Sequence, residues 1–261
     1  MTKVIVITSG KGGVGKTTIT ANLSVELALR GKRVLCIDAD IGLRNLDMIL
    51  GLENRIVYDV LDVLESRVPL SKALVRDKRG LQLWLLPANQ TKNKDAVDEN
   101  SWNRMIRDAS EDGSFDYIMI DCPAGIEQGF RIAVGPSQQA LVVVNPEVSS
   151  VRDADRIIGL LENMGKTKYQ LIINRIRWDS VKRGEMLSVS DVVDILKAPL
   201  IGVVPDEPKL VDYTNRGEPI VFSKLPISSA IKDIAARLDG EARQMIFHGD
   251  RKSIFDKLLG R

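Results

Sequence analysis

The stretch that decides the fold is Gly10–Thr17, which reads GKGGVGKT and directly follows the apolar run Val4–Ile7. It matches the pattern G-x-x-x-x-G-K-[ST], in which a strand runs into a glycine-rich loop that opens a helix. Because glycines carry no side chains, successive backbone N–H groups can turn inward and close on phosphate oxygens. The stretch therefore predicts a site for a nucleoside triphosphate.

The polar residues of this loop have separate expected roles. Lys16 supplies a positive charge for the outer phosphates, and the Thr17 hydroxyl suits Mg²⁺. Thr17 and Thr18 begin the next helix, whose N-terminal dipole favours an anion. We expect the nucleotide to contact the whole segment, which comprises Gly10, Lys11, Gly12, Gly13, Val14, Gly15, Lys16, Thr17 and Thr18. Lys11 is not required to hold a nucleotide and needs another explanation.

The composition indicates a globular α/β protein. The 261 residues can form one large domain or two small ones, and the 44% that are hydrophobic suffice for a full core. The formal net charge of +2 gives the chain as a whole no strong attraction for nucleic acid, which leaves room only for a local basic patch. We expect no N-terminal signal, because the first strand begins at Lys3, and no apolar run approaches the ~20 residues of a membrane span.

Cysteine and histidine usage excludes several kinds of site. Cys36 and Cys122 lie far apart and form no C-x-x-C pair, which favours two buried thiols in a reducing compartment. His248 is the only histidine of the chain, so neither a His-based metal site nor a His-containing catalytic triad can be built.

Short apolar runs alternate with amphipathic stretches along the chain. The runs are typical of strands buried on both faces of a sheet, and they are Val4–Thr8, Arg33–Asp38, Leu81–Leu86, Tyr117–Asp121, Ala140–Val144, Gln170–Asn174 and Leu200–Val204. Helical spacing predicts helices over Thr17–Arg30, Val151–Met164, Ser188–Leu196 and Ser229–Gln244. The alternation predicts a doubly wound α/β fold with a mostly parallel sheet and helices on both faces. The polar stretch Gln90–Asn100 is expected to be an exposed loop.

Two of the predicted strands end in carboxylates. Asp38 and Asp40 follow the second strand, and Asp121 ends the fourth, so all three are expected at the same sheet edge as the loop. Asp121 fits the residue that holds Mg²⁺ directly or through water. Asp38 and Asp40 alternate along an extended segment, so one can support the metal while the other, Asp40, orients the attacking water. The predicted metal site consists of Thr17, Asp38, Asp40 and Asp121, and Lys16 and Asp40 are candidate catalytic residues.

Two turns at the same edge are candidates for contact with the base. They are Asn174-Arg175, after the sixth predicted strand, and Pro205-Asp206, after the seventh. An asparagine side chain offers both a donor and an acceptor to the edge of an adenine. Residues of these types are equally typical of ordinary polar loops, so both interpretations of the two turns stay open.

The loop with its extra lysine resembles that of the deviant Walker A ATPases of the MinD/ParA group. Three further stretches resemble the septum-placing branch of this family more specifically, and they are Ile37–Asp47, Asp121–Glu127 and Asn145–Asp155. The similarity extends from Met1 to the final helix. It implies a P-loop NTPase fold, ATP rather than GTP, Mg²⁺, and hydrolysis stimulated by a partner protein.

The same resemblance implies a switch and a set of partners. Two ATP-bound subunits of the family pair face to face, and the signature lysine, here Lys11, reaches the partner's nucleotide and counts among the catalytic residues. The resemblance further implies a MinC-like division inhibitor, a MinE-like stimulator of hydrolysis, and a cytoplasmic protein that cycles to the inner membrane to place the division septum. Partners and the dimer mate are expected to meet around Ser149–Asp155, although an ordinary capped amphipathic helix explains those letters too.

The last residues form the second informative feature. We divide the chain into an ATPase domain, residues 1–248, and a tail, residues 249–261. At about 100° per residue, Ile254, Phe255, Leu258 and Leu259 share an apolar arc of about 140°, and Asp250–Arg261 carries four basic and two acidic residues. Such a helix can lie in an anionic lipid surface or pack on its own domain. The family resemblance favours a membrane-targeting helix, although Asp256 weakens its attraction to anionic lipid.

Two other functions fit parts of this pattern. A ParA-like partition ATPase would bind DNA non-specifically and need a basic face on the dimer. The balanced charge and the apolar tail argue against it, and we expect no specific nucleic acid. A redox ATPase resembling nitrogenase iron protein would need cysteine thiolates from two subunits for a shared [4Fe–4S] cluster. Cys122 follows the presumed magnesium ligand Asp121 directly, which disfavours that role.

Overall fold

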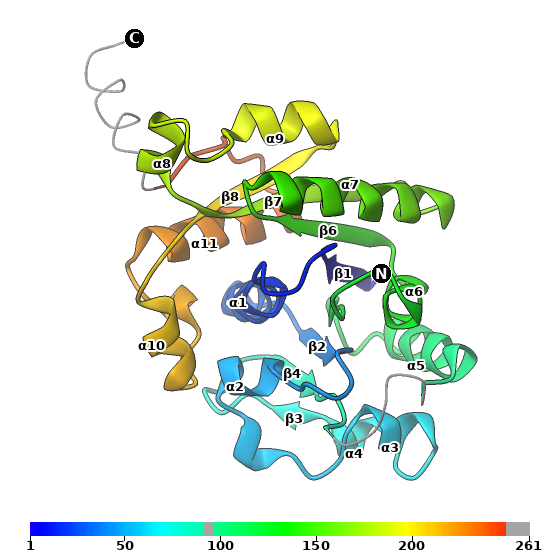
Figure 1. Cartoon of the computed structure of the whole chain (residues 1–261). Coiled ribbons are helices and arrows are strands. Elements are labelled where there is room, and N and C mark those ends of the chain that lie inside the picture. The colour runs from blue at the N-terminus through cyan, green and yellow to red at the C-terminus, as the bar shows by residue number, and fades with distance from the viewer. Residues whose placement is uncertain (91–96, 249–261) are drawn as a thin grey trace.

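The computed structural model describes residues 1–90 and 97–248 of the chain (Figure 1). Within them, eight strands form one sheet in the order β3-β4-β2-β5-β1-β6-β7-β8. Neighbouring strands run parallel, except that β3 pairs antiparallel with β4 at one edge. The strands are β1 (Lys3–Thr8), β2 (Val34–Asp38), β3 (Val75–Arg76), β4 (Leu83–Leu86), β5 (Tyr117–Asp121), β6 (Gln139–Val144), β7 (Tyr169–Ile176) and β8 (Leu200–Pro205).

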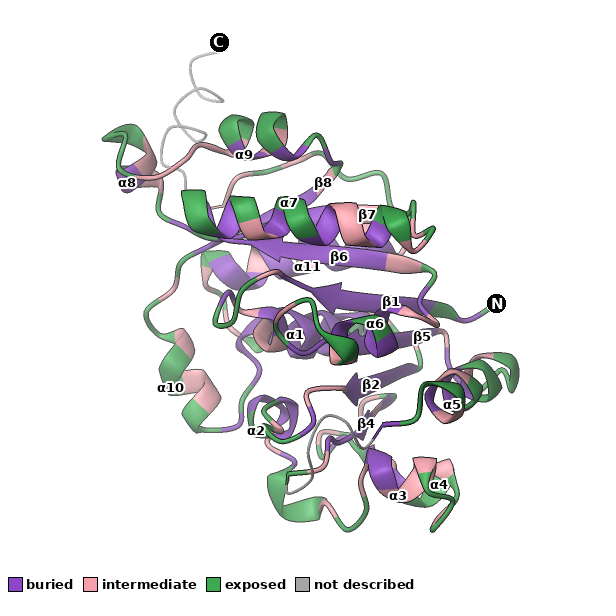
Figure 2. Ribbon diagram, turned by 45° about the vertical axis from the view of Figure 1, so that its right-hand side comes forward, coloured by how far each residue is buried: buried purple, intermediate pink, exposed green. Residues whose placement is uncertain are grey.

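Helices cover both faces of this sheet, and the strands between them are buried (Figure 2). The α-helices are α1 (Lys16–Leu29), α2 (Leu46–Leu50), α3 (Val60–Leu64), α4 (Leu70–Ala73), α5 (Glu99–Glu111), α6 (Gln128–Val134), α7 (Val148–Asn163), α8 (Trp178–Lys182), α9 (Val189–Leu196), α10 (Leu210–Asn215) and α11 (Pro226–Leu238). Short 3₁₀ turns occupy Glu53–Arg55 and Ile220–Phe222.

Alternation along the central strands creates two cores, one on each face. In β1, Val4 and Val6 belong to the core covered by α5, α6, α7 and α9, whereas Ile5 and Ile7 belong to the core covered by α1 and α11. A strand that is apolar at every position therefore has a partner layer on both sides. This confirms the predicted doubly wound, mostly parallel fold and explains why the predicted strands read as unbroken apolar runs.

The positions of the predicted elements agree with the structure, with three corrections at helix ends. The predicted helix Val151–Met164 begins too late, because α7 starts at Val148. The predicted helix Ser229–Gln244 is wrong at both ends, because α11 begins at Pro226, which occupies the first helical turn, and ends at Leu238. Gly240, with φ +96°, follows this end and stops the helix. The predicted loop Gln90–Asn100 is wrong at its end, because Asp98 accepts a hydrogen bond from the Ser101 N–H and caps α5 from Glu99 onward.

The sequence prediction omitted several short elements. They are the edge strand β3 and the helices α2, α3, α4, α6, α8 and α10, most of them too short to show a helical period, and the prediction also omitted the longer helix α5. The predicted tail, residues 249–261, lies outside the described residues, as do residues 91–96 of the predicted loop. Among the helices of the described part, none is both long and apolar enough to cross a bilayer.

Candidate nucleotide site

The Gly10–Thr17 loop connects β1, at the centre of the sheet, to the start of α1 at Lys16. Two of its glycines are needed because other groups approach the backbone closely. A Cβ on Gly10 would lie 2.3 Å from the Asp153 carbonyl oxygen, and a Cβ on Gly15 would lie 2.4 Å from the Asn174 side-chain nitrogen. Gly15 also has φ +99°, which favours glycine. The loop is thereby held between α7 on one side and the end of β7 on the other.

The two lysines of the loop lie in opposite environments. Lys16 is 7% exposed, and its ammonium donates to the Ser9 hydroxyl at 3.0 Å. Lys11 is exposed, and its ammonium lies 3.4 Å from the Ser149 hydroxyl in the first turn of α7. The position of Lys16 suits contact with a phosphate chain inside the loop. Lys11 is directed toward α7, and its action on a second subunit stays a prediction.

Asp38 and Asp121 face each other across neighbouring strands. They are partners in the parallel register of β2 and β5, and both are almost completely buried. The Asp38 carboxylate accepts hydrogen bonds from the backbone N–H groups of Asp40, at 3.0 Å, and of Asn45 and Leu46. The Asp121 carboxylate accepts one from the Thr20 hydroxyl at 3.2 Å. The sheet thus brings together two carboxylates that are separated by 83 positions in the chain.

The electrostatics of this pair fit a divalent cation. Burial raises the pKa of Asp121, and the charge of Asp38 raises it further, whereas hydrogen bonding to Thr17 and the charge of Lys16 lower it. Burial likewise raises the pKa of Asp38. Two buried carboxylates side by side repel each other unless a cation lies between or beside them. Carboxylate and hydroxyl oxygens are also the ligands that Mg²⁺ prefers.

The protein supplies only part of a coordination shell. Within residues 1–90 and 97–248, no cluster of three or more His, Cys, Asp or Glu side chains could hold a metal by itself. Mg²⁺ characteristically combines one or two carboxylates with waters and the phosphates of a substrate. The residues therefore fit a cation that arrives with a nucleotide, and the set Thr17, Asp38, Asp40 and Asp121 stays a prediction for its ligands.

The two predicted base turns lie side by side at the carboxyl ends of β7 and β8. Ile176 and Pro205 are register partners, and the Asp206 N–H donates to the Ile176 carbonyl at 3.0 Å. Arg175 is exposed and has φ +57°, a left-handed conformation at the register irregularity between Ile173 and Ile176 of β7. A pocket of about 420 Å³ adjoins Pro205 and Asp206. Contact between these turns and a base stays a prediction.

Asn174 has a role that the sequence did not indicate. Its side chain is buried, and its amide nitrogen donates to the Val14 carbonyl of the phosphate loop at 2.7 Å. One amide hydrogen thus braces the loop, so at most part of the side chain is left for an adenine. Three further residues were missed as well. Ser9 and Thr20 bond to Lys16 and Asp121, and Asp153 leaves no room for a side chain at Gly10. Only Ser9, which directly precedes the loop, could have been identified from its position.

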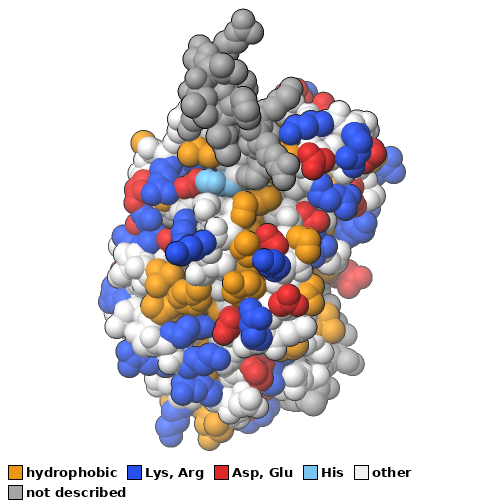
Figure 3. Space-filling model, turned by 90° about the vertical axis from the view of Figure 1, so that its left-hand side faces the viewer, with side chains coloured by type: hydrophobic (Ala, Val, Ile, Leu, Met, Phe, Trp, Pro, Cys, Tyr) orange, Lys and Arg blue, Asp and Glu red, His pale blue; other side chains and the backbone are white. Residues whose placement is uncertain are grey.

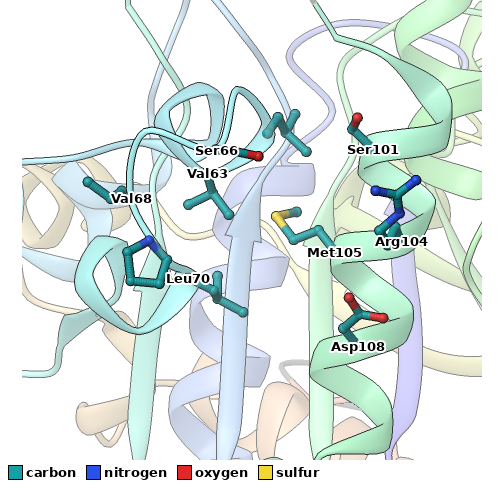
Figure 4. A pocket seen from close by; sticks show the side chains of 10 residues that line it. Val63, Ser66, Val68, Leu70, Ser101, Arg104, Met105 and Asp108 are labelled. Carbon is teal, nitrogen blue, oxygen red and sulfur yellow. The ribbon is translucent and has the colours of Figure 1, made fainter.

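A separate pocket of about 350 Å³ lies between the turn that follows α3 and the helix α5. In the close-up, side chains from α5 and from the α3–α4 region point toward one another across it (Figure 4). It is lined by Val63, Leu64, Ser66, Val68, Pro69, Leu70, Ser101, Arg104, Met105 and Asp108. None of these residues belongs to the predicted nucleotide site.

Comparison with known proteins shows the family to which the chain belongs. The sequence model described as the CobQ/CobB/MinD/ParA nucleotide binding domain matches residues 5–220. The chain belongs to this family. Septum site-determining protein MinD of Synechocystis sp. is 53% identical over 92% of this chain and 91% of its own length. MinD of Bacillus subtilis is 49% identical over 93% of this chain and 91% of its own length.

Solved structures of the family agree with the fold. The MinD chain in the MinC:MinD cell division protein complex of Aquifex aeolicus is 64% identical, with a TM-score of 0.90, covering 95% of this chain and 100% of its own. MinD of Pyrococcus horikoshii, complexed with Mg-ADP, is 30% identical with a TM-score of 0.82, covering 92% and 97%. A ParA family ATPase from Chlorobium tepidum, at 22% identity and a TM-score of 0.78, shares the fold alone.

These similarities confirm the predicted resemblance, the nucleotide class and the type of enzyme. As a MinD/ParA family member, the chain is a Mg²⁺-dependent ATPase. The structure gives no support to the iron–sulfur alternative, because Cys36 and Cys122 are both completely buried and burial raises the pKa of each thiol. Neither cysteine presents a thiolate at a surface that a second subunit could share.

Proposed function

We propose that this chain is a membrane-cycling ATPase that pairs in the presence of ATP and recruits a MinC-type inhibitor to place the division septum. The observation that carries the proposal is the pair of lysines in one loop. Lys16 is buried where it can hold a phosphate chain, and Lys11 lies exposed beside α7. The 64% identity to MinD in the MinC:MinD complex of Aquifex aeolicus supports the choice of partner.

The residues of the site have different roles in ATP hydrolysis. Loop N–H groups and Lys16 bind and orient the phosphates, and Lys11 of one subunit contacts the nucleotide of the other. Bound Mg²⁺ would neutralise phosphate charge, and Thr17, Asp38, Asp40 and Asp121 would hold it directly or through water. Asp40 orients the attacking water. A MinE-type partner stimulates this step by completing the arrangement of the two subunits.

The tail converts pairing into membrane attachment. Burying four large apolar side chains is worth at most about 6–12 kcal/mol, and ordering about ten residues opposes it by about 1–2 kcal/mol each. One tail therefore binds marginally, whereas two tails on one dimer can raise avidity by about 10²–10⁴-fold. The described chain ends on a face where apolar side chains form a band among charged ones (Figure 3). ATP thereby controls whether the protein is in the cytoplasm or on the inner membrane.

Co-sedimentation with anionic liposomes tests this proposal. We expect binding with a slowly hydrolysed ATP analogue and Mg²⁺, little binding with ADP, and loss of binding when Phe255→Glu and Leu258→Glu are combined. The matched control adds the same two charges at exposed positions of the described body, Val57→Glu and Leu29→Glu, and should sediment like the parent. Equal binding with ADP, or full binding by the tail variant, would contradict the proposal.

A further inference from the structure

The last described segment has no regular secondary structure, but side chains of α11 hold it through hydrogen bonds and ion pairs. Arg237 donates to the carbonyl oxygens of Arg243, at 3.2 Å, and Gln244, at 2.7 Å. Asp233 pairs with the Arg243 guanidinium at 2.5 Å and with the His248 ring at 2.6 Å. We call residues 243–248 the strap. It directly precedes the tail.

Trp178, the first residue of α8, holds the strap from the other side. Its indole N–H donates to the His248 carbonyl at 2.9 Å, and its ring lies 5.5 Å from the Phe247 ring at an interplanar angle of 35°. Trp178 thus fixes the end of the strap from which the tail continues.

The same residue faces the predicted base site. Trp178 lines the 420 Å³ pocket together with Pro205 and Asp206, the turn predicted to contact the base. The N–H of Asp206 is bonded to Ile176, two residues before Trp178. A group that fills this pocket therefore touches the base turn and the indole at once, while the indole N–H holds the strap.

We propose that Trp178 is a positioning residue that couples a bound nucleobase to closure of the strap. A base seated against Pro205 and Asp206 restricts Trp178, which in turn holds His248. This inference rests on the proposed ATPase function and on the predicted base site at Pro205 and Asp206. ADP and ATP carry the same base, so the coupling operates within one subunit and does not need the γ-phosphate, unlike pairing through Lys11. By linkage, closing the strap must strengthen nucleotide binding by the same factor.

Limited trypsin digestion at Arg243, followed by mass spectrometry, measures how often the strap opens. Cleavage there requires release from Arg237 and Asp233, and under slow proteolysis its rate follows the open population. Cleavage after Arg67, in the turn after α3, serves as the internal reference. We expect Mg-ADP and a slowly hydrolysed ATP analogue each to slow cleavage at Arg243 about fivefold relative to Arg67, the equivalent of one hydrogen bond. Inorganic tripolyphosphate with Mg²⁺ should have no such effect.

Two matched variants assign the effect to the indole N–H. Trp178→Phe keeps a ring against Phe247 but removes the donor to His248, and it should abolish the protection by ADP. Trp102→Phe makes the same change at a buried indole whose N–H has no hydrogen-bond partner among the described residues, and it should retain the protection.

Protection that persists in Trp178→Phe, or equal protection by tripolyphosphate, would overturn the inference. The comparison of ADP with tripolyphosphate uses the unaltered protein. It therefore tests whether protection at Arg243 needs the base even if Trp178→Phe does not fold. Absence of liposome binding would overturn the proposed function and leave the digestion result standing, which keeps the two failures distinct.

Discussion

The predicted phosphate side of the site and its predicted base side are built in opposite ways. The phosphate side lies at the ends of the central strands β1, β2 and β5, where Lys16, Asp38 and Asp121 are at most 7% exposed. The base side lies at the ends of the outer strands β7 and β8, where Arg175 and Asp206 are exposed. Charges that are buried and held by backbone groups bind strongly and need little rearrangement, whereas an exposed turn contributes less energy and adapts more readily.

From this contrast we predict that the chemistry takes place on the phosphate side and that selectivity for the base comes from the base side. It also indicates that variants of the phosphate side should have the larger effects. Asn174 is the exception that connects the two sides, because it lies near the end of β7 yet donates to Val14 of the phosphate loop.

The largest effect is expected at Asp40. Asp40→Ala should lower partner-stimulated ATP turnover by about 10²–10³-fold, because loss of a group that positions a nucleophile costs about that much. ATP binding and pairing should be retained, since Asp38 and Asp121 remain. Steady-state phosphate release, measured beside titration with the ATP analogue, separates the two effects. Asp108→Ala, which removes an exposed carboxylate of α5, is the control. Unchanged stimulated turnover in Asp40→Ala would rule out the assigned role.

The next effect separates the two lysines of one loop. Lys16→Ala should weaken Mg-ADP binding by about 10–100-fold, because it removes charge-assisted contacts worth about 1.5–3 kcal/mol. Lys11→Ala should leave Mg-ADP affinity within about twofold, because the Lys11 ammonium projects away from its own loop, but should prevent pairing with the ATP analogue. Calorimetry measures the affinity and sedimentation velocity measures the pairing. Similar losses of affinity in both variants would show that Lys11 serves its own subunit.

The same contrast explains what the sequence could predict. The phosphate loop, its strand and its helix are local in sequence, so a pattern of eight residues reveals them together. Asp38 and Asp121 were predictable because a parallel sheet places strand ends at one edge. The bond from Asn174 to Val14 joins residues 160 positions apart and depends on the geometry of the packed sheet, which no local pattern encodes.

The remaining misses have related causes. The sequence analysis did not predict α5 because charged residues dominate its exposed face, although Trp102, Met105 and Ile106 are buried at helical spacing. The sequence did not predict the strap, because its residues show no hydrophobic period. The strap is held by hydrogen bonds from side chains of α8 and α11. Elements with an apolar period or a glycine signature can be predicted from sequence, whereas segments held by side-chain bonds between distant elements cannot.

The smallest of these effects is expected at Asn174, where the two sides meet. Asn174→Ala leaves the Val14 carbonyl without its donor, which costs about 1–2 kcal/mol, so nucleotide binding should weaken about tenfold. Two roles for this side chain make different predictions. If the amide braces the loop, tripolyphosphate binding falls as much as ADP binding does. If the amide reads adenine, ADP binding falls and tripolyphosphate binding does not change.

The geometry favours the bracing role, because the amide nitrogen already donates to Val14 at 2.7 Å. Asp206→Ala is the matched control on the base side, since Asp206 is exposed and its backbone N–H, rather than its side chain, makes the bond to Ile176. This control should reduce ADP affinity by no more than about threefold and leave tripolyphosphate unaffected. Calorimetry with both ligands on both variants gives four affinities. Equal losses for both ligands in Asn174→Ala would place this base-side residue in the phosphate machinery, whereas a loss confined to ADP would restore the adenine contact that the sequence suggests.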